Sequence, residues 1–278
     1  MRLNLYDLQA GLPAENAWPV GEGSRRLHVM VSITWGPDVA EVYDATYAAG
    51  FAPAVLDPVV GLLAALAGGG PALEFAVGTG RVALALSARG IPVHGLELSR
   101  PMAERLLAKP GAGAVPVTIG DMTAARVPGG PFRLVYLVAN TIMNVTTQDD
   151  QVAVFTNAAA HLEPGGYFVI EVIVPQLRRV PPGESARVFT LQPDHIGIET
   201  FDDVAGQIAW SHHWIAAGDR LVRHSAPYRY VWPSELDLMA KITGFRLAGR
   251  WAGWDQAPFT SDSPAQVAVF EKLPAEPS

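Results

Sequence analysis

Along much of the chain, segments with the apolar pattern of a buried strand alternate with segments whose apolar residues have helical spacing. This pattern predicts a regular succession of strands and helices. Nearly continuous apolar runs, such as Phe132 to Ala139, are typical of strands that are buried on both faces of a sheet. The predicted strands cover residues 73–77, 91–96, 115–119, 132–139 and 167–174. The predicted helices cover residues 38–50, 54–66, 80–89, 100–108 and 147–162. This succession predicts an α/β fold with a doubly wound, mainly parallel sheet.

After the last of these strands, shorter runs of strand character predict a small antiparallel β insertion over residues 175–232, at the carboxyl edge of the sheet. Its predicted strands cover residues 187–191, 206–215 and 220–231. A helix over 234–243 and a C-terminal antiparallel hairpin follow, and the hairpin brings the sheet to seven strands. The hairpin segments are residues 245–251 and 266–272. We predict that residues 1–36 form an irregular N-terminal arm and that residues 37–278 form the folded domain.

Composition excludes several classes of function. The 278 residues are 49% hydrophobic, which is enough to bury a full core. The net charge of −7 and the absence of a basic stripe argue against a nucleic-acid partner. The chain has no cysteine, which fits a reducing cytoplasm. We expect a cytoplasmic protein without a membrane partner, because no apolar run reaches the roughly 18 residues of a membrane helix and the first residues lack a signal-peptide core.

The clearest chemical signal lies at residues 73–81, where a predicted strand runs into Gly78-Thr79-Gly80 and then into an apolar helix. Glycines let a ligand approach the backbone, and the following helix points free N–H groups and its positive end at that ligand. A Gly-x-Gly turn alone is a weak signal. The carboxylate of Glu74 ahead of the turn would repel a pyrophosphate, and therefore favours a cationic or zwitterionic ligand.

Four segments follow parallel strands and should meet at the switch in strand order, where α/β sheets bind ligands. These segments are Gly78–Gly80, Glu97, Gly120–Met122 and Asn140–Thr141. Glu97 can accept hydrogen bonds from ribose hydroxyls. Asp121 can accept one from an exocyclic amine, with Met122 against an adenine ring. The plainer alternatives are a solvated charge at Glu97 and a local turn cap at Asp121.

Together these segments resemble the class I S-adenosylmethionine methyltransferases of the small-molecule type. The resemblance rests on Glu74–Gly80, Gly95–Ser99, Gly120–Met122 and His161–Gly166, and it covers residues 38–175 and, less closely, the final hairpin. It departs from the family at Ala76-Val77, where a second small residue or Cys is common. The resemblance implies a Rossmann-like fold and S-adenosyl-L-methionine as the cofactor. The cofactor-binding residues that we expect are Tyr43, Glu74, Ala76, Gly78, Gly80, Glu97, Leu98, Asp121, Met122 and Asn140.

The Tyr43-Asp44-x-x-Tyr47 segment is similar to the N-terminal lid helix of small-molecule members, in which a tyrosine closes over the cofactor. Tyr47 and Asn144 are the acceptor-binding residues that we expect. The overall layout is similar to that of the amino-sugar N,N-dimethyltransferases, which also carry an antiparallel insertion after the fifth strand. The expected partner is therefore a small-molecule acceptor, such as a natural-product or sugar intermediate, and a homodimer remains open.

Two residues are candidates for a catalytic base. Glu171 lies near the carboxyl end of a predicted strand, where a buried carboxylate needs a partner and could grip or deprotonate an acceptor. His161 precedes a Pro-Gly-Gly turn, a position more typical of a histidine that complements a helix dipole. His212 and His213 are neighbours on a predicted strand and point to opposite faces, so no metal site is expected. The lack of an outstanding base favours N-methylation or a self-activated hydroxyl.

The predicted function is S-adenosylmethionine-dependent methyl transfer to an N or O atom of a small molecule. An NAD(P)-dependent oxidoreductase is the first alternative, because Gly78-x-Gly80-x-x-Ala83 fits the relaxed dinucleotide fingerprint and Glu97 fits its ribose acid. Glu74 and Gly120–Met122 argue against it. A non-catalytic cofactor-binding module is the second alternative, and the aromatic residues of the insertion argue against it by favouring a real acceptor pocket.

Overall fold

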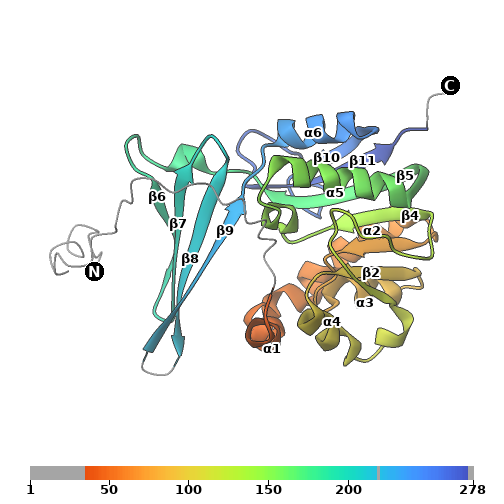
Figure 1. The fold of residues 1–278 in the computed structure, drawn as a ribbon, viewed down its shortest axis with the longest axis horizontal. Helices are drawn as coiled ribbons and strands as arrows, with labels where there is room; N and C mark the ends of the chain where they lie inside the picture. The colour runs from red at the N-terminus through yellow and green to blue at the C-terminus, as the bar shows by residue number, and fades with distance from the viewer. Residues whose placement is uncertain (1–34, 218–219, 275–278) are drawn as a thin grey trace. The chain divides into compact units, whose positions relative to one another are not determined.

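The computed structural model describes residues 35–217 and 220–274, and Figure 1 shows their two β-sheets. The predicted N-terminal arm lies outside the described residues, except for Trp35 and Gly36, which precede the first helix without regular structure. No helix of the described part of the chain is long and apolar enough to cross a membrane.

The larger sheet has seven strands in the order β10-β11-β5-β4-β1-β2-β3. Their bounds are β1 (Ala72–Phe75), β2 (Val93–Glu97), β3 (Val117–Ile119), β4 (Phe132–Leu137), β5 (Leu162–Ile173), β10 (Phe245–Trp251) and β11 (Ala265–Lys272). Strands β1 to β5 pair in parallel, whereas β11 runs antiparallel to both β5 and β10. The predicted seven-stranded, mainly parallel sheet with a C-terminal antiparallel hairpin is confirmed.

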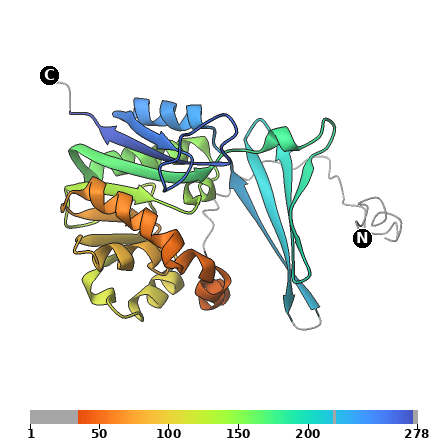
Figure 2. The same cartoon turned by 180° about the vertical axis from the view of Figure 1, so that it is seen from behind.

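Helices pack on both faces of this sheet, and each face has its own apolar core (Figures 1 and 2). One core joins α5 (Gln148–His161) and α6 (Pro233–Ile242) to the sheet, and the other joins α2 (Pro53–Ala67), α3 (Arg81–Ser87) and α4 (Arg100–Leu107). Successive residues of β4 from Leu134 to Leu137 alternate between the two cores, as expected for a strand that is buried on both faces. The 3₁₀ helices are η3 (Ala48–Phe51), η4 (Ala112–Ala114), η5 (Thr141–Asn144) and η6 (Leu177–Arg179).

Two helix starts are fixed by side-chain caps that the sequence suggests. Ser99 Oγ accepts a hydrogen bond from the backbone N–H of Met102 at 3.3 Å, and Thr147 Oγ1 accepts one from Asp150 at 3.1 Å. The first helix, α1 (Pro37–Thr46), is shorter than predicted, because the chain passes through the η3 turn before Pro53 starts α2.

The insertion forms a separate antiparallel sheet in the order β6-β7-β8-β9 (Figure 1). Its strands are β6 (Ala186–Gln192), β7 (His195–Asp203), β8 (Ile208–Ala217) and β9 (Arg220–Arg229). The sequence prediction contained three strands and missed β7. The buried positions of β7 are Gly197, Glu199 and Phe201, so a glycine and a charged residue replace the alternating apolar residues that identify a strand.

A buried arginine ties the insertion to the larger sheet's helices. Arg229, at the end of β9, donates hydrogen bonds to Gln151 of α5 and, at 2.7 Å, to Glu235 of α6. Phe201 and Ala209 of the insertion belong to the same apolar core as α5 and α6. These contacts fix the base of the insertion beside the carboxyl ends of β4 and β5.

Candidate active site

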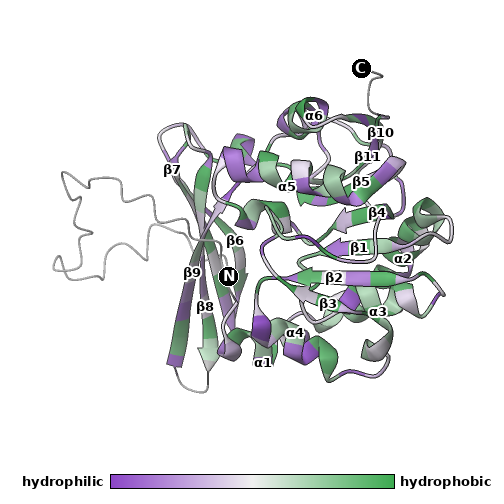
Figure 3. Cartoon of the chain, turned by 45° about the vertical axis from the view of Figure 1, so that its right-hand side comes forward, coloured by the Kyte–Doolittle hydropathy of each residue, from purple (hydrophilic) through white to green (hydrophobic). Residues whose placement is uncertain are grey.

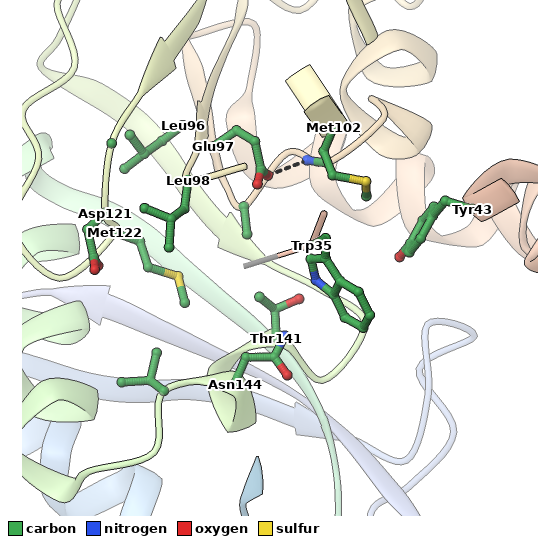
Figure 4. A pocket seen from close by; sticks show the side chains of 14 residues that line it. Trp35, Tyr43, Leu96, Glu97, Leu98, Met102, Asp121, Met122, Thr141 and Asn144 are labelled. Atoms are coloured by element: carbon green, nitrogen blue, oxygen red, sulfur yellow. Dashed lines mark hydrogen bonds between the residues drawn. The ribbon is translucent and has the colours of Figure 1, made fainter. Parts of the chain in front are cut away.

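A cavity lies at the carboxyl ends of β1 to β4, and Figure 4 shows the side chains that line it. Because these strands are parallel, the loops that follow them meet at one edge of the sheet. The cavity brings together most of the cofactor-binding residues that the sequence predicts, together with one of the two expected acceptor residues, Asn144. The predicted cofactor residues that line it are Tyr43, Ala76, Gly78, Glu97, Leu98, Asp121 and Met122.

Glu97 is held rigidly at the end of β2. Its side chain is 5% exposed, and its two oxygens accept hydrogen bonds from the backbone N–H groups of Gly78 and Ser99, each at 2.8 Å. Burial raises the pKa of Glu97, and the backbone hydrogen bonds oppose this shift. Each carboxylate oxygen has a second lone pair. Glu97 can therefore accept further hydrogen bonds from hydroxyl groups inside the cavity.

Asp121 is fixed by a local turn at the cavity wall. Its Oδ1 accepts hydrogen bonds from the backbone N–H and from the hydroxyl of Thr123, both at 2.8 Å. The turn-cap interpretation of Asp121 is therefore correct, and it is compatible with a ligand contact because the residue also lines the cavity beside Met122.

The loop after β1 has three residues in the left-handed region, with φ values of 52° at Ala76, 57° at Gly78 and 83° at Gly80. Ala76 and Gly78 line the cavity. Gly80 does not line it. A Cβ atom at Gly80 would lie 2.7 Å from the side chain of Leu106. This glycine therefore allows α3 to start close to α4, and it does not form a wall of the cavity.

Glu74, another predicted cofactor residue, is buried and does not line the cavity. Its side chain is 2% exposed and accepts a hydrogen bond from the Tyr136 hydroxyl at 3.0 Å. Burial raises the pKa of Glu74 to about 8, although the Tyr136 hydroxyl, the Arg81 cation and the Ala83 backbone all favour the charged form. Glu74 therefore joins β1 to β4 through Tyr136.

The raised pKa of Glu74 predicts a pH-dependent stability. Between its unfolded pKa near 4.5 and its folded pKa near 8, the native state binds the additional proton, so stability from this group falls as the pH rises. In Glu74→Gln this dependence is absent. We expect the free energy of unfolding of the wild type to fall relative to the variant by about 1 kcal/mol between pH 6 and pH 7, as urea denaturation would measure. Parallel pH profiles for the two proteins would contradict the buried placement.

A second cavity of about 650 Å³ adjoins the first, and we call it the chamber. The two share Trp35, Tyr43, Thr141 and Asn144. Tyr47 and Asn144, the expected acceptor residues, both line the chamber. The insertion also contributes three lining residues, which are Glu199, Ser211 and Tyr228.

Glu171 lies in the chamber wall near the end of β5. One of its oxygens accepts a hydrogen bond from the Ala139 backbone N–H and the other accepts one from the indole Nε1–H of Trp254, each at 2.8 Å. Asn140, a predicted cofactor residue, lines the chamber and does not line the cofactor cavity. Its Oδ1 accepts a hydrogen bond from Ile173 at 2.8 Å, so Asn140 joins the ends of β4 and β5 beside Glu171.

His161 is not placed to act as a base. Its Nε2 accepts a hydrogen bond from the Val127 backbone at 2.9 Å, so its Nδ1 carries the proton that is donated to the Asn157 carbonyl at 2.8 Å. Burial lowers the pKa of His161, which keeps the ring neutral. Both ring nitrogens of this catalytic candidate therefore hold local structure, and the residue lines neither cavity.

The adjacent histidines of β8 have different partners. His213 Nδ1 lies 2.8 Å from His195 Nε2, whereas the His212 ring stacks on Trp210. Within residues 35–217 and 220–274, no group of three or more His, Asp or Glu side chains could hold a metal ion.

Comparison with known proteins identifies the family. A model of the methyltransferase domain matches residues 72–166. The solved structure of the CcbJ methyltransferase from Streptomyces caelestis is 31% identical, with a TM-score of 0.77, and the match covers 88% of this chain and 100% of that one. The cypemycin N-terminal methyltransferase of Streptomyces sp. is 25% identical over 240 residues, which are 83% of this chain and 98% of the relative.

A third relative is the dTDP-4-amino-2,3,4,6-tetradeoxy-D-glucose N,N-dimethyltransferase of Saccharopolyspora spinosa, which is 34% identical over 143 residues, or 50% of this chain and 56% of the relative. This chain belongs to the class I S-adenosylmethionine-dependent methyltransferases. It is an enzyme, and its cofactor is S-adenosyl-L-methionine. The oxidoreductase and the non-catalytic module, which the sequence left open, are thereby set aside.

Proposed function

We propose that the enzyme transfers a methyl group to the nitrogen of an amine in a small molecule. The main support is the chamber beside the cofactor cavity, where the oriented carboxylate of Glu171 lies among aromatic side chains. Carboxylates and aromatic faces attract a protonated amine. The name of one relative, an N,N-dimethyltransferase, describes transfer to nitrogen, and that of another, an N-terminal methyltransferase, describes transfer at an amino terminus.

The lining of the first cavity fits the cofactor. Glu97 offers carboxylate oxygens to the ribose hydroxyls, while Leu98 and Met122 offer apolar surface to the adenine and Asp121 accepts from its amine. The backbone of Ala76 and Gly78 would hold the methionine part, and Tyr43 would close over it. When bound, S-adenosylmethionine supplies an electrophilic methyl group. No Lys or Arg side chain is among the described residues that line this cavity, which suits a cationic sulfonium.

The chain's own residues then have to align the acceptor and prepare its nitrogen. We assign to Glu171 the binding of the ammonium group and the removal of its proton, which leaves a neutral amine with a free lone pair. Burial raises the pKa of Tyr43, so this residue stays a neutral phenol. Tyr43, Tyr47 and Asn144 would exclude water and orient the acceptor. The predicted methyltransferase domain covers residues 37–278. Its β insertion at residues 175–232 would cover the side of the site at which the acceptor binds.

A product assay tests the proposal. The full-length enzyme is incubated with S-adenosylmethionine and paired compounds that differ only in an amine or a hydroxyl at one position, and the products are identified by mass spectrometry. We expect N-methylated products. Methylation of the hydroxyl compounds alone would show that the acceptor atom is oxygen and would contradict the proposed transfer to nitrogen. The homodimer, the cytoplasmic location and the absence of a nucleic-acid partner stay predictions from the sequence.

A further inference from the structure

We propose that the acceptor is an amine on an apolar body without phosphate groups, and that this body binds in a side arm of the chamber between α1 and the β8–β9 hairpin. The inference rests on the proposed transfer to an amine and names the kind of molecule that carries it. The side arm is the cavity lined by Val39 and Val42 of α1, by Ile215 of β8, and by Ala226 and Pro227 of β9.

The side arm adjoins the proposed site of methyl transfer. It has a volume of about 520 Å³ and shares Trp35, Tyr43 and Asn144 with the cofactor cavity. It also shares Tyr47 and Tyr228 with the chamber that contains Glu171. A molecule whose amine lies at Glu171 can therefore extend into the side arm without leaving the protein.

The walls of the side arm are mainly apolar, and they are open to water. Val42 is 53% exposed and Ile215 is 37% exposed. Figure 3 shows hydrophobic residues over the hairpin end of β8 and β9. Contiguous apolar surface beside a polar site is typical of a ligand-binding groove, because covering it with an apolar group removes it from water. This surface favours an acceptor with an apolar body.

The charges of the walls argue against a phosphorylated acceptor. Asp38, Glu171 and Glu199 are the carboxylates that line the chamber and the side arm. Among the described lining residues, Arg81 alone carries a permanent positive charge, and it donates a hydrogen bond to the Gly50 carbonyl. Two histidines, His213 and His224, also line the side arm.

His213 does not supply the missing positive charge. Burial and three neighbouring histidines lower the pKa of His213, so its ring favours the neutral form. Arg187 approaches the chamber but pairs with Glu199 at 2.5 Å. A diphosphate would therefore meet a negatively charged wall. The relative from Saccharopolyspora spinosa carries a dTDP-linked sugar in its name, and the lining of this chain differs from what such a substrate requires.

Calorimetry on the full-length enzyme saturated with S-adenosylhomocysteine tests the inference, with 4-phenylbutylamine, methylamine and dTDP as probes. We expect 4-phenylbutylamine to bind at least about 10-fold more tightly than methylamine, because the side arm covers its ring and methylene groups. We expect no binding heat with dTDP. Ile215→Asn and Val42→Asn change opposite walls of the side arm. Each should weaken the binding of 4-phenylbutylamine by about 5-fold and leave the affinity for S-adenosylhomocysteine unchanged.

Leu221→Asn is the matched control, because Leu221 is a 55% exposed residue of the same hairpin that does not line the side arm. Its affinity for 4-phenylbutylamine should equal that of the wild type. Binding of dTDP as tight as that of 4-phenylbutylamine, or unchanged affinity in both wall variants, would overturn the inference. If 4-phenylbutylamine binds as expected but only hydroxyl compounds are methylated, the transfer to nitrogen is wrong and the side arm stands.

Discussion

Replacing Glu171 by Gln is expected to lower kcat for methyl transfer to an amine by about 100-fold or more, the usual effect of losing a group that moves a proton. Both oxygens of Glu171 accept hydrogen bonds, from the Ala139 N–H and from the Trp254 indole. A glutamine presents one oxygen and one NH₂ group, so it leaves one of these donors without an acceptor. It also cannot take a proton from the ammonium group.

Steady-state kinetics and calorimetry together check this result. The affinity for S-adenosylhomocysteine should not change, because Glu171 does not line the cofactor cavity. Glu163→Gln is the matched control. Glu163 lies at the other end of β5, where it forms a partly exposed ion pair with Arg133 at 3.4 Å. Equal kcat values for the two variants would show that Glu171 takes no part in the reaction.

Glu97→Ala is expected to weaken the binding of S-adenosylhomocysteine by about 1–3 kcal/mol, the range for buried groups that lose a charged hydrogen-bond partner. The change removes the acceptor for the proposed ribose hydroxyls. It also leaves the N–H groups of Gly78 and Ser99 without the carboxylate that they contact at 2.8 Å. The loop after β1 and the start of α4 would then lose their common anchor.

The affinity is measured by calorimetry, and the thermal midpoint of the ligand-free variant separates a binding defect from a folding defect. Glu104→Ala is the control, because Glu104 is an exposed residue of α4 outside the cavity. Its affinity should match that of the wild type. A Glu97→Ala protein that binds S-adenosylhomocysteine normally would place the ribose at another residue.

The parallel strands of the main sheet could be predicted from the sequence because they contain apolar runs, most of which are separated by a helix with its own periodicity. The insertion could be predicted only in part. The hydrophobic pattern identifies β8 and β9, but the buried face of β7 carries Gly197 and Glu199, whose burial depends on a neighbouring strand. Local pattern alone contains no information on that partner.

The candidate site shows the same limit. The sequence locates the glycine loop and the acidic strand end at Glu97, because both are local patterns. It does not show which side chains turn toward the cavity. Glu74 points instead toward Tyr136, its register partner on β4, and Gly80 faces Leu106 of α4. The contact between Trp254 and Glu171 joins residues far apart in the chain, so it depends on the assembled fold.

A crystal structure of the full-length enzyme with S-adenosylhomocysteine tests whether the loop after β1 holds the cofactor. We predict that the ribose hydroxyls lie within hydrogen-bond distance of the Glu97 carboxylate, that the adenine packs on Met122, and that the sulfur faces the chamber containing Glu171. A nucleoside bound elsewhere, with no contact to Glu97 or to the backbone of Gly78, would contradict the assignment of this cavity.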